Sequence, residues 1–364
     1  MKILLIGEYS NVHWTLAQGL RALGHEVVVL SDGDGWKNYP RDWDLKRNAY
    51  TRTGGIGYSL RLLRLLPRLR GFDVVQLINP LFLEVKAERL FSVYNYLRKH
   101  NGRVFLAAYG MDRYWVKAGC DCSSFRYSDF NIGSELRDSE DIRTWKKDWL
   151  EGKKGQLNTY IAQDCDGIIA GLYEYWVSYH PHFADKTAFI PFPINTEEIT
   201  PTSPCKDGKI RCFIGIQKTR NEYKGTDVLL RALENVAKAY PQCEIVKAES
   251  VPYADYQNMM NHSDLLLDQL YSYTPAMNGL LAMSKGLVLV GGGEPEAYDL
   301  LNEPELRPII NVQPNEEDVQ RQLAFIMEHP ERIPVLSEMS KQYIAKHHHY
   351  VKVAGQYLQF WTKG

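Results

Sequence analysis

The sequence lacks the features that mark several common classes of protein. Its 364 residues carry 43 lysines and arginines against 44 aspartates and glutamates, so there is no basic excess for general nucleic-acid binding. No apolar run approaches the roughly 18 residues that a membrane-spanning helix needs. The residues after Met1 do not form a secretory signal pattern. We therefore expect a cytoplasmic protein without a nucleic-acid partner.

Cysteine and histidine are too scattered to form a metal site. The six cysteines include one close pair, Cys120 and Cys122, whereas structural zinc sites use two such pairs. His347, His348 and His349 are adjacent, and on a helix three consecutive side chains diverge around the axis. We predict reduced thiols, surface histidines, no metal and no cofactor.

What the sequence does contain is an alternation of strand and helix patterns. Residues 2–7 (KILLIG) and 27–31 (VVVLS) are apolar runs typical of buried strands, and residues 14–24 carry leucines at the i, i+4, i+7 spacing of one helical face. This βαβ unit predicts the start of a doubly wound sheet. The first turn reads GEYSNVH and lacks G-x-G-x-x-G, which argues against an NAD-dependent oxidoreductase.

The alternation is interrupted once and then resumes, which indicates two domains. A proline-punctuated linker lies near residues 195–205, and a new strand begins at residue 210. A chain of this length can bury two separate cores. We predict an α/β protein with a Rossmann-like domain over residues 1–198, a second over 199–340, and a helical closing segment over 341–364.

Residues 264–296 form the most informative stretch of the second domain. They read as strand, turn, helix, strand and glycine-rich turn, with Thr274 as the predicted N-cap and Pro275 as the first helical residue. Gly286 suits the end of that helix, and the turn that includes Gly292 and Gly293 follows the second strand. Free N–H groups at a helix start and in such a turn attract phosphate, although one glycine turn alone equally fits a simple change of chain direction.

A basic turn after the strand at 210–217 faces the same edge of the predicted sheet. It contains Lys218, Arg220 and Lys224. The carboxyl ends of parallel strands meet at one edge, so these cations should converge with the helix start and the glycine-rich turn. The combination predicts a site for a diphosphate.

Two further segments depart from the plain alternation. Residues 58–72 place Arg61, Arg64, Arg68 and Arg70 among leucines. This pattern fits either a core-facing helix with solvated arginines or a basic amphipathic helix on an anionic membrane surface. Residues 111–150 are aromatic, charged and irregular, and so long a segment inside an α/β domain predicts a functional loop.

With these motifs in order, the sequence resembles the GT-B glycosyltransferases, in particular the retaining enzymes of family 4. FIGIQKTRNEYKGTDVLLRAL resembles the family's strand, basic turn and Lys-Gly segment, and LLAMSKGLVLVGGGEPE resembles its E-A-M-A-x-G-x-P-V-V…G-G-x-P-E block. IPFPINTEEITP resembles its interdomain linker, and the closing aromatic helix resembles the one that crosses back to the first domain. The resemblance implies two Rossmann-like doubly wound domains facing a cleft.

The resemblance also implies which residues bind the donor. Those candidates are Lys218, Arg220, Lys224, Tyr273, Thr274, Asn278, Gly292, Gly293 and Glu296. The family's paired glutamates, which contact the donor sugar and the ribose, fall on Tyr273 and Leu281, and neither residue is acidic. Asn278 lies one helical turn before Leu281, and we expect it to hydrogen-bond the donor instead.

Two residues of the first domain are the predicted catalytic groups. The family's histidine after the fourth strand has no counterpart, and Asp112 stands near that place. His13 lies on the first turn between strand and helix and should face the same cleft by topology.

The expected activity is transfer of a sugar from a UDP- or GDP-sugar to a glycan or lipid-linked acceptor, in cell-surface polysaccharide synthesis and with retained stereochemistry. No metal is expected to be needed, because fixed cations and dipoles can stabilise the leaving diphosphate. Peripheral contact with the inner face of a membrane is expected through residues 58–70.

The alternative is a catalytically silent GT-B protein that binds a nucleotide or a partner glycosyltransferase. A nucleotide-sugar epimerase of the same architecture has no distinctive residue in this sequence.

Overall fold

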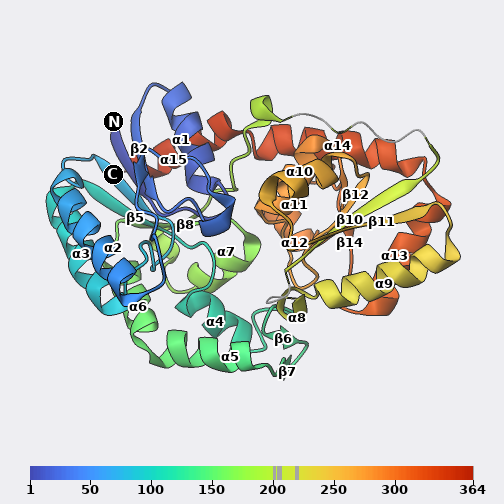
Figure 1. The fold of residues 1–364 in the computed structure, drawn as a ribbon, viewed down its shortest axis with the longest axis horizontal. Helices are drawn as coiled ribbons and strands as arrows, with labels where there is room; N and C mark the ends of the chain where they lie inside the picture. Colours follow the sequence, from blue (N-terminus) through green and yellow to red (C-terminus); the bar gives the residue numbers. More distant parts are fainter. Residues whose placement is uncertain (200–201, 203–206, 218–220, 364) are drawn as a thin grey trace. The chain divides into compact units, whose positions relative to one another are not determined.

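The computed structural model describes residues 1–199, 202, 207–217 and 221–363. Contacts within the chain divide it into two compact units (Figure 1). The first unit comprises Met1–Ser124, Leu136–Pro193 and Tyr350–Gly364, and the second comprises Phe125–Glu135 and Ile194–His349. Each unit is described by itself below.

The first unit contains a seven-stranded parallel sheet of order β3-β2-β1-β4-β5-β8-β9. Its strands are β1 (Lys2–Ile6), β2 (Glu26–Ser31), β3 (Trp43–Asp44), β4 (Val74–Leu77), β5 (Arg103–Ala107), β8 (Gly167–Ala170) and β9 (Thr187–Phe189). The central strands are buried along almost their whole length, as their continuous apolar runs predict. The strand order reverses between β1 and β4, which makes that edge the switch point of the first unit.

Helices flank this sheet. They are α1 (Val12–Ala22), α2 (Arg52–Leu65), α3 (Ala87–His100), α4 (Arg113–Cys120), α5 (Glu140–Trp145), α6 (Lys153–Asp164), α7 (Tyr173–Tyr179) and α15 (Tyr350–Thr362). The last helix, red in Figure 1, lies against α1, which is blue, although they stand at opposite ends of the sequence. A Cβ atom on Gly19 of α1 would lie 2.4 Å from the carbonyl oxygen of Tyr350, so only glycine permits this approach.

The arginine-containing helix begins earlier than its leucine pattern predicts. Helix α2 starts at Arg52 and not at residue 58, because the Thr51 hydroxyl accepts the Gly54 N–H at 3.1 Å and caps it. Pro67 lies in the short 3₁₀ turn η2 (Leu66–Arg68) that ends the helical segment. The segment between β2 and α2 contains the edge strand β3.

The second unit contains a five-stranded parallel sheet of order β11-β10-β12-β13-β14. Its strands are β10 (Ile210–Ile216), β11 (Cys243–Glu249), β12 (Leu265–Leu267), β13 (Val288–Gly291) and β14 (Ile310–Asn311). Its helices are α8 (Asn221–Lys224), α9 (Thr226–Ala239), α10 (Tyr253–Asn261), α11 (Met277–Lys285), α12 (Pro295–Leu300), α13 (Glu316–Glu328) and α14 (Arg332–His347). The order reverses between β10 and β12, which is the switch point of this unit.

The three consecutive histidines lie at a joint between helices and not on one exposed helix. Helix α14 ends at His347, and α15 starts at Tyr350. His348 is 3% exposed, and its carbonyl accepts the Ile194 N–H at 2.7 Å. The prediction of three surface histidines is therefore wrong for His348, because the chain that enters the second unit covers this joint.

The irregular stretch at 111–150 is largely structured. It contains α4, α5, the π-helical turn η3 (Lys146–Glu151) and a hairpin of β6 (Asn131–Ile132) and β7 (Glu135–Leu136). The part Phe125–Glu135, which we call the insert, belongs to the second unit although the chain on either side of it belongs to the first. Across the described residues, no helix is long and apolar enough to span a membrane.

Candidate ligand site of the second unit

A polar cluster occupies the switch point of the second unit. Asp268 is the first residue after β12, which pairs with β10, and Asn278 lies in the first turn of α11. The Asn278 amide nitrogen is 3.3 Å from an Asp268 carboxylate oxygen, and its amide oxygen accepts the Tyr256 hydroxyl at 2.9 Å. Gly215 of β10 makes room for Tyr256, because a Cβ atom there would lie 2.9 Å from the ring. Crevices at switch points are where open α/β sheets bind ligands.

Asp268 carries the negative charge of this cluster. Burial raises the pKa of its carboxyl group, and the positive charge of Lys224 is the next cause and works in the opposite direction. The N–H groups of Gln269 and Gly279 also donate to this carboxyl. Lys224 ends α8 beside the loop that follows β12, and its carbonyl accepts the Leu270 N–H at 3.0 Å. The site therefore combines a carboxylate, an amide, a phenol and an ammonium group.

The carboxylate of Asp268 changes the interpretation of the helix start. Helix α11 begins at Met277 with Ala276 as its N-cap, so the prediction that Thr274 caps it is wrong. The N–H of Gly279, in the first turn of α11, donates to the carboxylate of Asp268. Asp268 follows strand β12, so the sequence of the helix itself cannot reveal this acceptor. Thr274 is 5% exposed, and its carbonyl accepts the Ser272 hydroxyl at 3.1 Å. In this structure the predicted phosphate position at the helix start faces a protein carboxylate.

The glycine-rich turn is shaped by close packing. A Cβ atom on Gly292 would lie 2.0 Å from the carbonyl oxygen of Ser272, so no other residue fits there. The N–H of Gly293 donates to the Asn311 side chain at 3.0 Å, and the N–H of Glu294 donates to the Tyr273 carbonyl at 3.2 Å. Packing alone accounts for both glycines, and their role in donor binding stays a prediction.

Tyr273, which the sequence resemblance aligns with the first of the paired glutamates, is covered by the insert. It is 2% exposed, and its ring packs against Phe125 and Tyr127 at centroid distances of 5.8 and 4.9 Å. Its hydroxyl accepts the backbone N–H of Arg126 at 2.8 Å, and the guanidinium lies over the ring at 5.0 Å. A ligand could reach this side chain only if the insert moved.

Glu294 anchors the insert to the glycine-rich turn. Its carboxylate is 4% exposed and accepts the Tyr127 hydroxyl at 2.6 Å, the Gln313 amide at 2.9 Å and the Asn311 amide at 3.1 Å. The Arg126 guanidinium pairs with it at 2.7 Å. Burial alone would raise the pKa of Glu294, but these donors together hold it below its ordinary value.

The predicted donor residue Glu296 belongs to the same cluster. Its carboxylate pairs with the Arg126 guanidinium, which therefore lies between two glutamates of one turn. Lys218 and Arg220 lie outside the described residues. The sequence predicts a functional loop over residues 111–150, and this role stays a prediction. Nothing in the sequence indicates that Arg126 and Tyr127 contact the glycine-rich turn of the second unit.

His13 of the first unit lies inside a closed network. It is fully buried, its Nδ1 is 2.8 Å from the Gly7 carbonyl and its Nε2 is 3.1 Å from the Gln76 amide nitrogen. A carbonyl can only accept, so Nδ1 carries the proton and Nε2 accepts from Gln76. Burial lowers the pKa of His13 to about 3. This neutral, sealed imidazole holds β1 and β4 together at their switch point.

Asp112 of the first unit also has a structural environment. It is fully buried and caps α4 by accepting the Trp115 N–H at 2.8 Å, and the Tyr179 hydroxyl donates to it at 2.7 Å. Burial raises the pKa of Asp112 to about 6. The structure brings neither Asp112 nor His13 to an open surface of the first unit, so their catalytic role remains a prediction.

Glu8 contacts the buried network around His13, and its ionisation should make the stability of the first unit depend on pH. Its carboxyl group is 2% exposed and accepts the N–H groups of His13 and Trp14 at 3.3 and 2.9 Å, at the start of α1. Burial raises the pKa of Glu8 to about 8, from an ordinary value of 4.5. A raised acid pKa stabilises the fold most below pH 4.5, and this contribution is lost as the pH rises through 8.

Glu8→Gln should remove that dependence. We expect similar stability of variant and parent near pH 5, and a variant that is more stable by about 4 kcal/mol at pH 8.5. Urea unfolding at both pH values measures the difference, with Glu26→Gln, an exposed glutamate of β2, as the control. Parallel profiles for parent and Glu8→Gln would contradict the assignment.

Comparisons with known proteins address the fold. No protein-family model matches the sequence, and no curated protein matches it either. Among solved structures, the HepE protein of Anabaena in complex with UDP and glucose matches with a TM-score of 0.62 and 12% identity over 100% of both chains. Sucrose-phosphate synthase of Thermosynechococcus elongatus matches with a TM-score of 0.64 and 12% identity over 99% of this chain and 98% of that one. WaaG, a glycosyltransferase involved in lipopolysaccharide biosynthesis, matches with a TM-score of 0.57 and 12% identity over 100% of both chains.

The chain has the GT-B fold. Two parallel sheets flanked by helices, each with a Rossmann-like strand order, agree with these neighbours over the whole chain. At 12% identity the likeness concerns architecture. Within the GT-B fold of this chain, the polar cluster at β10 and β12 is the candidate ligand site. Among the described residues, no group of three or more His, Cys, Asp or Glu could hold a metal ion.

Proposed function

We propose that this GT-B protein transfers a sugar from a UDP- or GDP-sugar to a glycan or lipid-linked acceptor, as a retaining enzyme similar to family 4. The polar cluster of Asp268, Asn278, Tyr256 and Lys224 at the switch point is the observation that carries the proposal. The fold supports it, since the neighbours include HepE with UDP bound and WaaG, a glycosyltransferase. Synthesis of a cell-surface polysaccharide at the inner membrane face fits such an acceptor.

In this proposal Lys224 neutralises the donor diphosphate, together with Lys218 and Arg220. The positive charge of Lys224 already acts on this site, since it lowers the pKa of the Asp268 carboxyl group. Preorganised charge of this kind is what stabilises a leaving diphosphate. Asn278 is oriented by Tyr256 on one side and by Asp268 on the other. It is therefore positioned to hydrogen-bond a donor hydroxyl, in place of the absent glutamates.

A second candidate function is a catalytically silent protein that binds a nucleotide or a partner glycosyltransferase. The covered Tyr273 favours it, because the position that would contact the donor sugar is 2% exposed beneath the insert. Leu281, at the position of the second glutamate, has no hydrogen-bonding side chain. A silent binder would still need Lys224 and the switch-point cluster.

A screen of nucleotide-sugars separates these functions. The protein is incubated with UDP- and GDP-sugars, with and without glycan and lipid-linked acceptors, and release of nucleoside diphosphate is measured. Acceptor-dependent release supports the enzyme. Binding of UDP or GDP without release under any of these conditions supports the silent binder, and no binding at all contradicts both.

Asn278→Ala provides a sharper prediction for the site. If Asn278 bonds a donor hydroxyl, the variant should lose at least roughly tenfold in kcat/KM when it is assayed well below its Tm. Its bonds to Tyr256 and Asp268 also predict a modest loss of Tm, and Tyr256→Phe is the matched control because it removes one of these bonds and keeps the Asn278 amide. Equal losses of activity and Tm in the two variants would make Asn278 a structural residue.

A further inference from the structure

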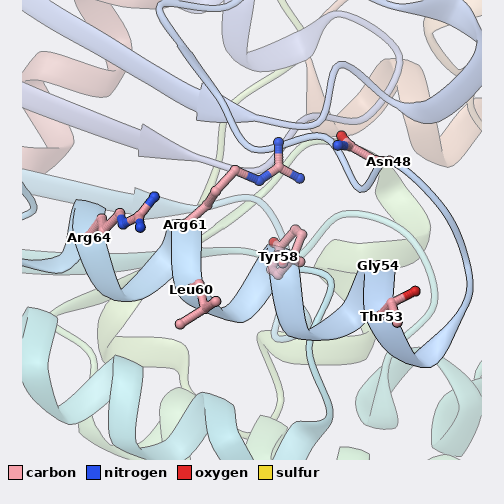
Figure 2. A pocket seen from close by; sticks show the side chains of 8 residues that line it. Asn48, Thr53, Gly54, Tyr58, Leu60, Arg61 and Arg64 are labelled. Carbon is pink, nitrogen blue, oxygen red and sulfur yellow. The ribbon is translucent and has the colours of Figure 1, made fainter.

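The first unit carries a cavity between helix α2 and the chain that precedes it. Its volume is about 310 Å³, at the small end of the range for ligand pockets. Figure 2 shows Arg61 and Arg64 on one side of α2, with Arg61 extending toward Asn48. Most of the side chains at the cavity can form hydrogen bonds. They include Asn48, Thr53, Tyr58, Arg61 and Arg64.

The two arginines of the cavity differ in how firmly they are held. Arg61 is half-buried and donates to the Lys46 carbonyl at 2.5 Å, which fixes its orientation. Arg64 lies one helical turn later, is exposed, and has neither a hydrogen bond nor an ion pair with the described part of the chain. A guanidinium group can bind a carboxylate or a phosphate with two parallel hydrogen bonds. The cavity therefore offers one fixed and one adaptable binding group for an anion.

An exposed aromatic ring stands beside the cavity. Tyr50 is 78% exposed, the highest value for any large apolar side chain among the described residues. Its hydroxyl donates to Glu84 Oε1 at 2.8 Å, and the N–H of Glu84 donates at 3.0 Å to the hydroxyl of Tyr58, which lines the cavity. The Arg47 guanidinium lies over the Tyr50 ring at 5.1 Å. The ring is thus held in place although it is exposed, and such a ring suits the packing of a sugar ring against it.

The charges near the cavity favour a ligand that is not purely anionic. Glu84 places a carboxylate beside the two tyrosines, and its Oε2 is buried and accepts no hydrogen bond from the described residues. A carboxylate at this place repels a bare polyanion, whereas it can accept a hydrogen bond from a hydroxyl group. The surroundings of the cavity therefore suit a ligand with one anionic group and several hydroxyl groups.

We propose that this cavity binds an acidic saccharide, in which a sugar residue carries a carboxylate or phosphate group. The anionic group binds Arg61 and Arg64. The hydroxyl groups of the sugar bond Asn48 and Thr53, and an adjoining sugar ring packs on Tyr50. The site is separate from the polar cluster of the second unit. The inference goes beyond the proposed function, because binding here needs neither a donor nor a transfer reaction.

Calorimetric titration of the full-length protein with trigalacturonate, an acidic trisaccharide, tests the proposal. Maltotriose has as many sugar rings and no charge, and tricarballylate has as many carboxylates and no sugar ring. Trigalacturonate should bind at least about tenfold more tightly than either of them. Equally tight binding of tricarballylate would make the cavity a general anion site, and equally tight binding of maltotriose would remove the arginines from the site.

Variants with matched controls locate the binding. Arg64→Gln should weaken binding of trigalacturonate by about tenfold, whereas Arg70→Gln, which changes an exposed arginine outside the cavity lining, should bind like the parent. Tyr50→Ala should weaken binding by about fivefold, and Tyr50→Phe, which keeps the ring, by less than about twofold. A second measurement needs no variant: hydrogen exchange within residues 48–64 should slow when trigalacturonate is added to the unmodified protein.

Three further results would overturn the proposal. One is failure of the unmodified protein to bind trigalacturonate, and a second is unchanged binding after Arg64→Gln. The third is displacement of trigalacturonate by vesicles that contain phosphatidylglycerol, which would make the cavity a site for lipid headgroups. No nucleotide is present in these titrations, so failure here leaves the proposed function intact, and the reverse also holds.

Discussion

Glu294→Gln should reduce the stability of the second unit by about 3 kcal/mol and release the insert. The carboxylate accepts from Tyr127, Asn311 and Gln313 and pairs with Arg126, and it is 4% exposed. A neutral amide cannot accept from all of these donors, and removing one partner of a buried charged cluster leaves the others desolvated and unpaired. The largest change should appear in hydrogen exchange of residues 125–135.

Glu296→Gln is the matched control for that experiment. Glu296 belongs to the same turn and pairs with the same Arg126, but its side chain is 29% exposed. Exposed ion pairs contribute little, so this variant should lose at most about 1 kcal/mol. Urea unfolding gives the stabilities, and exchange within the insert reports its release. Equal losses in the two variants, or unchanged exchange after Glu294→Gln, would show that aromatic packing alone holds the insert.

Lys224→Ala should weaken binding of UDP or GDP by roughly ten- to a hundredfold. A charge-assisted contact with phosphate is worth about 1.5–3 kcal/mol, and Lys224 also offsets the negative charge of Asp268. Without the lysine, a diphosphate would approach an unopposed carboxylate. Calorimetric titration of the nucleotide measures the change, and Lys238→Ala, on an exposed lysine of α9, is the control.

A double variant shows how Lys224 acts. If the lysine works partly by offsetting Asp268, then Asp268→Asn should restore part of the affinity that Lys224→Ala loses. If Lys224 only contacts phosphate, the two effects should add. Unchanged affinity after Lys224→Ala would remove the residue from the donor site. An unmodified protein that binds neither nucleotide would contradict the proposed function itself.

The parts of this fold that the sequence predicts well are set by short-range physics. The apolar runs of β1 and β2 appear as buried parallel strands, as predicted. Helix α11 ends where Gly286 permits a left-handed conformation, with φ of 94°. Both signals lie within a few residues of the feature that they determine.

The parts that the sequence does not predict depend on distant partners. The carboxylate of Asp268, which lies outside α11, accepts an N–H of its first turn. The prediction that the helix begins with Thr274 and Pro275 is therefore wrong. Asp112 follows a strand, which is a common place for a catalytic group. Its carboxylate, however, accepts hydrogen bonds from the Tyr179 hydroxyl and the Trp115 N–H. Arg126 has no local signal at all, because its two glutamate partners lie in the glycine-rich turn of the second unit.

The insert and α15 also affect how the protein is made. A ribosome releases residues 125–135 well before residues 194–349, so Phe125, Tyr127 and Phe130, all buried in the finished protein, have no second unit to pack on at first. Helix α1 is likewise covered by α15, which buries Val353, Ala354 and Tyr357. Neither unit can complete its fold from the N-terminal half of the chain. The nascent protein therefore exposes apolar surface of the first unit until α15 emerges from the ribosome, and a chaperone that protects this surface would have to stay bound until then.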